Sequence, residues 1–148
     1  MAEAGRAIIQ AVRASGSRAL PWDDAAAYAE AMLERDVAAY RSVARLEGLV
    51  FFDHGLPDVA GYRRLAGLPF CPATDGACRL HRYDRRVFIA PSWPEIYVAD
   101  AERRQTFDEA ERTYRTMIET YRGYGYELIE LPLATVVERV AFVLDRLT

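Results

Sequence analysis

The chain has 148 residues, of which 51% are apolar and 28% charged, with a formal net charge of −3. This length suits one globular domain with a single core. The small negative charge disfavours nucleic-acid binding, which usually needs a basic face. The sequence has no apolar run long enough to span a membrane and no signal-peptide pattern at its start. We therefore expect a cytoplasmic protein.

All 19 basic residues are arginines, since the sequence contains no lysine. Chemistry that requires a lysine is therefore excluded from these residues. Cys71 and Cys78, with His81 three residues later, lack the spacing of a paired zinc-binding cluster. We expect two free thiols rather than a zinc site or a disulfide, because cytosolic thiols stay reduced.

The first half of the chain predicts three helices and one strand. Helical spacing of apolar residues predicts a helix over residues 3–14 and a long helix from Trp22–Asp23–Asp24 to Gly48. The apolar stripe of the long helix is expected to contain Ala29, Leu33, Val37, Tyr40 and Ala44. The run Leu49–Val50–Phe51–Phe52 predicts a strand buried on both faces. Pro57 favours the first turn of a helix to about Leu65, with residues 67–76 as a loop.

The second half predicts two further strands and two helices. The strands are expected at Val87–Phe88–Ile89–Ala90 and at residues 126–131. A helix over residues 106–122 begins with a capping box of Thr106 and Glu109. A final helix begins with a second box, formed by Thr135 and Glu138.

Strands that alternate with helices predict an α/β fold, a three-layer sandwich with a mostly parallel sheet. The whole chain, residues 1–148, is interpreted as a single domain. Three strands are few for at least five helices, because so narrow a sheet leaves its helices poorly covered. We therefore expect that a central strand is missing from these residues.

Asp53 is the strongest candidate for a functional residue, because it ends a predicted buried strand. Ligands of open α/β sheets bind at the carboxyl ends of strands, where a carboxylate can hold Mg²⁺ or act as a base. An aspartate in this position can equally cap the turn that follows. Arg103 and Arg104 follow the second predicted strand, where guanidinium groups suit phosphate oxygens. A solvated charged face is the alternative interpretation of these arginines.

Two further acidic positions have simple structural explanations. Asp58 follows Pro57 and is expected to be a first-turn helix charge. Glu3 stands at the start of the first predicted helix, where the helix dipole alone accounts for it.

These segments together resemble a family of bacterial predicted ATPases of the AAA-type P-loop class, which are distantly similar to nucleoside and nucleotide kinases. The resemblance covers nearly the whole chain, and the matching segments occur in the order of the family. They are Glu3-Ala4-Gly5-Arg6-Ala7-Ile8-Ile9, Val50-Phe51-Phe52-Asp53-His54-Gly55-Leu56-Pro57-Asp58, Arg82-Tyr83-Asp84-Arg85-Arg86-Val87-Phe88, Pro94-Glu95-Ile96-Tyr97, Asp100-Ala101-Glu102-Arg103-Arg104-Gln105 and Gly125-Tyr126-Glu127-Leu128.

The resemblance implies ATP and Mg²⁺ as ligands. It makes Asp53 the carboxylate linked to the metal through water and places Arg103 and Arg104 in a lid over the phosphates. It also implies that Glu3 and Arg6 lie near the pocket of an unknown acceptor. His54 and Asp58, which belong to the same matching segment as Asp53, are expected to bind substrate. His54 departs from the family, which usually has arginine there, and a neutral imidazole does not replace a guanidinium's paired contact.

The larger departure is the phosphate loop, a Gly-x-x-x-x-Gly-Lys-Ser/Thr pattern that the sequence does not contain. We expect an N-terminally truncated domain without the first strand, loop and helix, inactive alone and able to self-associate through an exposed sheet edge. A naturally shortened, catalytically dead binding module is the first alternative. An unrelated small enzyme that uses Asp53, His54 and Glu3 is the second.

Overall fold

The computed structural model describes residues 24–96 and 106–147. The chain divides into two compact units, Met1–Tyr83 and Asp84–Thr148, and each is described by itself. The helix predicted over residues 3–14 lies outside the described residues.

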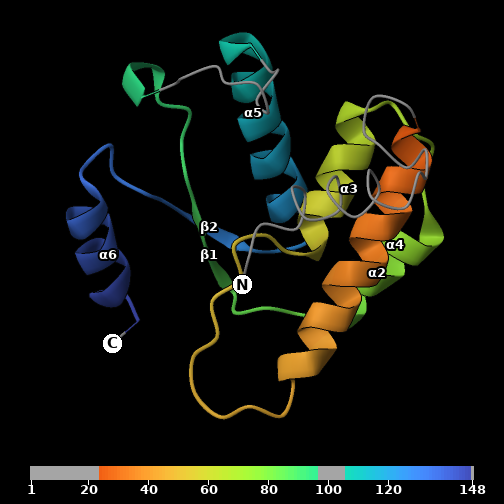
Figure 1. Cartoon of the computed structure of the whole chain (residues 1–148), viewed down its shortest axis with the longest axis horizontal. Coiled ribbons are helices and arrows are strands. Elements are labelled where there is room, and N and C mark those ends of the chain that lie inside the picture. The colour runs from red at the N-terminus through yellow and green to blue at the C-terminus, as the bar shows by residue number, and fades with distance from the viewer. Residues whose placement is uncertain (1–23, 97–105, 148) are drawn as a thin grey trace, which may run out of the picture. The chain divides into compact units, whose positions relative to one another are not determined.

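The first unit is helical, with α2 (Ala25–Val43), α3 (Leu56–Leu65) and α4 (Pro72–Leu80) side by side (Figure 1). Asp24 caps α2, because its Oδ1 accepts a hydrogen bond from the Ala27 amide at 2.9 Å. The predicted long helix is therefore confirmed. It ends at Val43 instead of Gly48, and Gly48 itself has φ +90° in the segment that follows.

The core of the first unit lies between α2 and α3 and contains Tyr28, Met32 and Val59. Tyr28 also meets Tyr62 of α3 edge to face, with ring centroids 5.2 Å apart. The buried residues of α2 are Tyr28, Ala29, Met32 and Asp36. Ala29 of the predicted stripe is buried and Leu33 packs against the core, which confirms this part of the prediction. The buried residues Met32 and Asp36 each lie one position before the predicted Leu33 and Val37, which rotates the buried face by about 100° around the helix axis.

The strand predicted at Leu49–Val50–Phe51–Phe52 is wrong. These residues have irregular backbone, and the side chains of Leu49 and Phe51 are 71% and 55% exposed. A parallel strand is stabilised by hydrogen bonds to its neighbours, and the described residues provide no strand beside this segment.

The loop predicted over residues 67–76 is also wrong in its second half, where α4 begins at Pro72. Pro72 suits the first turn of a helix, although proline and Gly76 together suggested a loop. Thr74 and Cys78 lie one turn apart and are 3% and 1% exposed. This burial, on a helix that packs against α3, outweighs the weak helix propensity of glycine.

The second unit contains β1 (Arg86–Ile89), the 3₁₀ turn η1 (Pro94–Ile96), α5 (Phe107–Gly123), β2 (Glu127–Glu130) and α6 (Val136–Leu144). The two strands pair in parallel, with Arg86 opposite Glu127 and Ile89 opposite Glu130. Both predicted strands and their parallel pairing are thus confirmed. Figure 1 draws α5 and α6 on opposite sides of the strands.

Both predicted capping boxes are confirmed. The Glu109 amide donates to Thr106 Oγ1 at 3.2 Å, and the Thr106 amide donates back to Glu109 Oε2 at 2.7 Å. Thr135 and Glu138 repeat this exchange at the start of α6. These hydrogen bonds hold the pKa of both glutamates below its usual value, because they favour the carboxylate.

The described residues define a mixed helix and strand fold with a two-stranded parallel sheet, compatible with the α/β class. The three-layer sandwich stays a prediction. None of the helices in residues 24–96 and 106–147 is long and apolar enough to cross a membrane.

Candidate functional site

Asp53 and His54 lie in a bend between the irregular apolar segment and the start of α3. Asp53 Oδ2 is 3.5 Å from His54 Nδ1, and the two side chains are 58% and 45% exposed. Both groups are therefore accessible to a ligand from solvent. In the described part of the chain, this bend is where the sequence candidates come together.

Asp58 caps the helix that follows the bend. Its Oδ2 accepts a hydrogen bond from the Gly55 amide at 2.7 Å, while the Asp58 amide donates to the Gly55 carbonyl at 2.9 Å. This agrees with the sequence interpretation of Asp58 as a first-turn helix charge. One of its carboxylate oxygens is thus already used inside the protein, and a role in substrate binding stays a prediction.

Asp36, a candidate that sequence reasoning missed, lies one turn beyond Met32 on the buried face of α2. It is 7% exposed, and its Oδ2 is buried without a hydrogen-bond partner. Burial raises the pKa of Asp36 to about 6, and the negative charge of Asp58 adds to this effect, while His54 and Arg35 oppose it. The spacing of four from Tyr28 to Met32 to Asp36 was the signal that could have found it.

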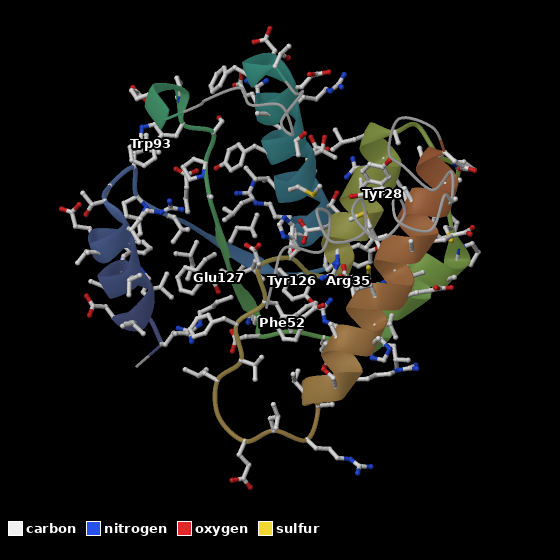
Figure 2. All side chains as sticks on the ribbon, in the orientation of Figure 1. Tyr28, Arg35, Phe52, Trp93, Tyr126 and Glu127 are labelled. Atoms are coloured by element: carbon white, nitrogen blue, oxygen red, sulfur yellow. The ribbon has the colours of Figure 1, made fainter. Side chains whose placement is uncertain are left out.

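The aromatic rings of Tyr40, Phe52 and Tyr83 pack together beside the bend. Phe52 and Tyr83 meet edge to face at 5.1 Å, and Tyr40 meets Tyr83 edge to face at 5.4 Å. Tyr40 also contacts the ring of His81 at 5.1 Å. Figure 2 labels Phe52 in the segment before α3 and Arg35 on α2. This cluster fixes the chain immediately before Asp53.

The remaining predicted site residues are not placed. Glu3, Arg6, Arg103 and Arg104 all lie outside the described residues. The structure therefore brings together Asp53, His54 and Asp58 from one segment and adds Asp36 from α2.

The donor atoms of this site suit a hydrated cation better than a closed metal cage. Within residues 24–96 and 106–147, no group of three or more His, Cys, Asp or Glu side chains is arranged to hold a metal ion. This finding also gives no support to zinc at Cys71, Cys78 and His81, and neither cysteine forms a disulfide in the described residues. One exposed carboxylate such as Asp53 fits Mg²⁺, which keeps several waters and commonly takes one or two carboxylates together with substrate phosphates.

Parallel strands joined through a helix are typical of α/β proteins, and β1 and β2 pair in this way around α5. The comparison with protein families agrees, because a family model described as an AAA domain matches residues 1–139. The chain belongs to this family, which indicates a nucleotide-binding domain of the P-loop kind. No curated protein and no solved structure shows a significant match.

Proposed function

We propose that the chain is part of a P-loop enzyme that binds ATP with Mg²⁺ and hydrolyses or transfers the γ-phosphate, without the Gly-rich phosphate loop of that enzyme. The observation that carries this proposal is an exposed Asp53 at the start of α3 in a chain of the AAA domain family. A single accessible carboxylate suits a cation that is bound mainly by water and phosphate oxygens. We place this activity in the cytoplasm.

Each candidate has a distinct role in this proposal. The Asp53 carboxylate holds Mg²⁺ through water, and the bound ion supplies charge that favours phosphoryl transfer. Arg103 and Arg104 contact the phosphates, because guanidinium groups match phosphate oxygens. Glu3 and Arg6 contribute to the acceptor pocket. His54 donates a single hydrogen bond, and not a guanidinium's paired contact, to a phosphate or to the acceptor.

A phosphate-binding loop has to come from outside the 148 residues, since these contain no lysine. Such a loop provides backbone N–H groups and a lysine charge to the β- and γ-phosphates. We therefore expect the 148-residue chain to bind ATP weakly and to hydrolyse it very slowly. A longer version that includes a Gly-rich loop should bind ATP with Mg²⁺.

Calorimetry with ATP and Mg²⁺ tests the proposal on both versions. In the longer version, Asp53→Asn should weaken Mg²⁺-dependent binding by about tenfold, because it removes the negative charge from the cation site. Asp108→Asn is the matched control, since Asp108 is an exposed aspartate in the first turn of α5. Equal binding by both variants would refute the role of Asp53. Tight Mg²⁺-dependent binding by the 148-residue chain itself would show that no loop is needed.

The absence of lysine also favours a second candidate, a binding module of the same family without catalysis. This candidate predicts cooperative unfolding of the 148-residue chain together with no ATP hydrolysis by any longer version. A longer version with turnover would exclude it.

We also propose self-association through the open edges of the sheet. In the described residues β1 and β2 pair only with each other, so each has one edge without a strand. Light scattering should detect dimers or larger species, and a monomer at all concentrations would contradict this proposal.

A further inference from the structure

Tyr83 contacts the candidate site segment at two points. Its ring meets the ring of Phe52 edge to face at 5.1 Å. Its hydroxyl accepts a hydrogen bond from the Leu56 amide at 3.2 Å. Between these two points lie Asp53, His54 and Gly55. One side chain therefore holds both ends of the segment that carries the exposed acid.

The hydrogen bond to Leu56 has a clear physical reason. The first N–H groups of a helix have no partner within the helix. At the start of α3 the Gly55 amide is bound by Asp58, and Pro57 has no N–H. Leu56 is fully buried, so water cannot easily satisfy its amide. The Tyr83 hydroxyl supplies the acceptor that this amide needs.

The ring contact is itself supported by a second tyrosine. Tyr40 of α2 lies over Phe52 with ring centroids 6.4 Å apart and meets Tyr83 edge to face. The Tyr40 hydroxyl donates a hydrogen bond to the Arg82 carbonyl at 2.8 Å, directly before Tyr83. The aromatic group thus joins α2, the segment before α3 and residues 82–83 within the first unit.

We propose that Tyr83 is a positioning residue for Asp53. It acts through its two contacts on the backbone at Phe52 and Leu56 and does not touch a ligand. With both ends held, the bend presents the Asp53 carboxylate in one orientation, and binding a cation there requires little further ordering of the chain. This inference rests on the proposed function, because it assumes that Asp53 takes a hydrated divalent cation.

The test uses the 148-residue chain, Mn²⁺ as the cation probe, and two variants that each lose one hydroxyl. Tyr83→Phe keeps the ring and removes the acceptor of the Leu56 amide. Tyr114→Phe is the matched control, because it also removes a tyrosine hydroxyl that makes a hydrogen bond, but to Glu130 within the second unit.

The first measurement is amide hydrogen exchange at Leu56, followed by nuclear magnetic resonance. We expect about tenfold faster exchange in Tyr83→Phe and less than a twofold change in Tyr114→Phe, since one net hydrogen bond corresponds to roughly this factor. Unchanged Leu56 exchange in Tyr83→Phe overturns the inference.

The second measurement is the broadening of the His54 and Gly55 amide signals by added Mn²⁺. In the parent chain we expect broadening that Asp53→Asn abolishes. Tyr83→Phe should raise the Mn²⁺ concentration for half-broadening about fivefold, and Tyr114→Phe should leave it within twofold. A Mn²⁺ response in Tyr83→Phe equal to that of the parent overturns the positioning role alone. No broadening in the parent overturns the inference about Tyr83, whereas the role of Asp53 in Mg²⁺-dependent ATP binding fails only if Asp53→Asn leaves that binding unchanged in the longer version.

Discussion

The buried carboxyl of Asp36 should make the stability of the protein depend on pH in an unusual direction. The pKa of Asp36 rises from 3.8 to about 6 in the folded chain, chiefly because the group is buried. Between these two values the folded state binds more protons than the unfolded state, so stability falls as pH rises. The protonated Asp36 carboxyl therefore makes its full contribution to stability below pH 3.8, and this contribution is lost as pH rises through 6.

The size of this effect follows from the shift. One unit of pKa difference corresponds to about 1.4 kcal/mol, so the full effect is about 3 kcal/mol. With the folded pKa at about 6, roughly half of this effect is lost between pH 5.0 and 7.5. The rest is lost at lower pH, where other carboxyl groups also titrate.

Urea unfolding of Asp36→Asn and the parent chain from pH 5.0 to 7.5 measures this loss. The neutral amide does not titrate, so the variant should gain on the order of 1 kcal/mol relative to the parent over this range. Glu34→Gln on the exposed side of α2 is the control and should follow the parent. Parallel pH profiles for the parent and Asp36→Asn would refute the reasoning. A carbon-13 titration of the Asp36 carboxyl gives an independent check.

Three other predictions concern single sites. Thr106→Ala should reduce the free energy of unfolding by about 1 kcal/mol in urea denaturation, because it removes half of the capping box. At Gly76 and Gly125 an added methyl group would meet no other atom, so only the backbone decides the effect of an alanine. Gly125→Ala should lower the free energy of unfolding by about 1 kcal/mol, because Gly125 has φ +81°. Gly76→Ala should raise it by a similar amount, because alanine favours the helix α4 more than glycine does. Cys71 should react with iodoacetamide well before Cys78, because hydrogen bonds from Thr74 lower the pKa of the Cys71 thiol and Cys78 is buried. Peptide mass spectrometry measures the labelling of each cysteine, and equal labelling would contradict this prediction.

Local signals in the sequence predicted the helix starts well. Asp24, Thr106 and Thr135 each accept a hydrogen bond from the amide three residues ahead, and Pro57 lies in the first turn of its helix. Such contacts need only neighbouring residues, so their residue types and spacing are sufficient evidence. The parallel pairing of β1 and β2 was predictable for a related reason, since a helix between two apolar runs leaves parallel strands as the usual outcome.

The errors arose where the outcome depends on distant residues. The propensity of Pro72 and Gly76 favoured a loop, but contact with α3 stabilises a helix that buries Cys78. The buried face of α2 was misplaced by one residue because apolar spacing alone does not show which side meets α3. This rotation of about 100° decides whether Asp36 faces water or the core, and the spacing of four from Tyr28 to Met32 to Asp36 was the one sequence signal of its burial.

The same distinction separates what was predictable at the candidate site from what was not. Asp53 was found from its place after an apolar run, although that run is not a strand in the described residues. The contacts that hold it in place come from Tyr40, twelve residues before Phe52, and from Tyr83, twenty-seven residues after Leu56. The sequence indicates Asp53 as the candidate residue, but only the folded first unit shows which residues contact the segment around it. Because those supporting residues are aromatic and far away in the chain, changing their hydroxyls tests the site without changing its charge.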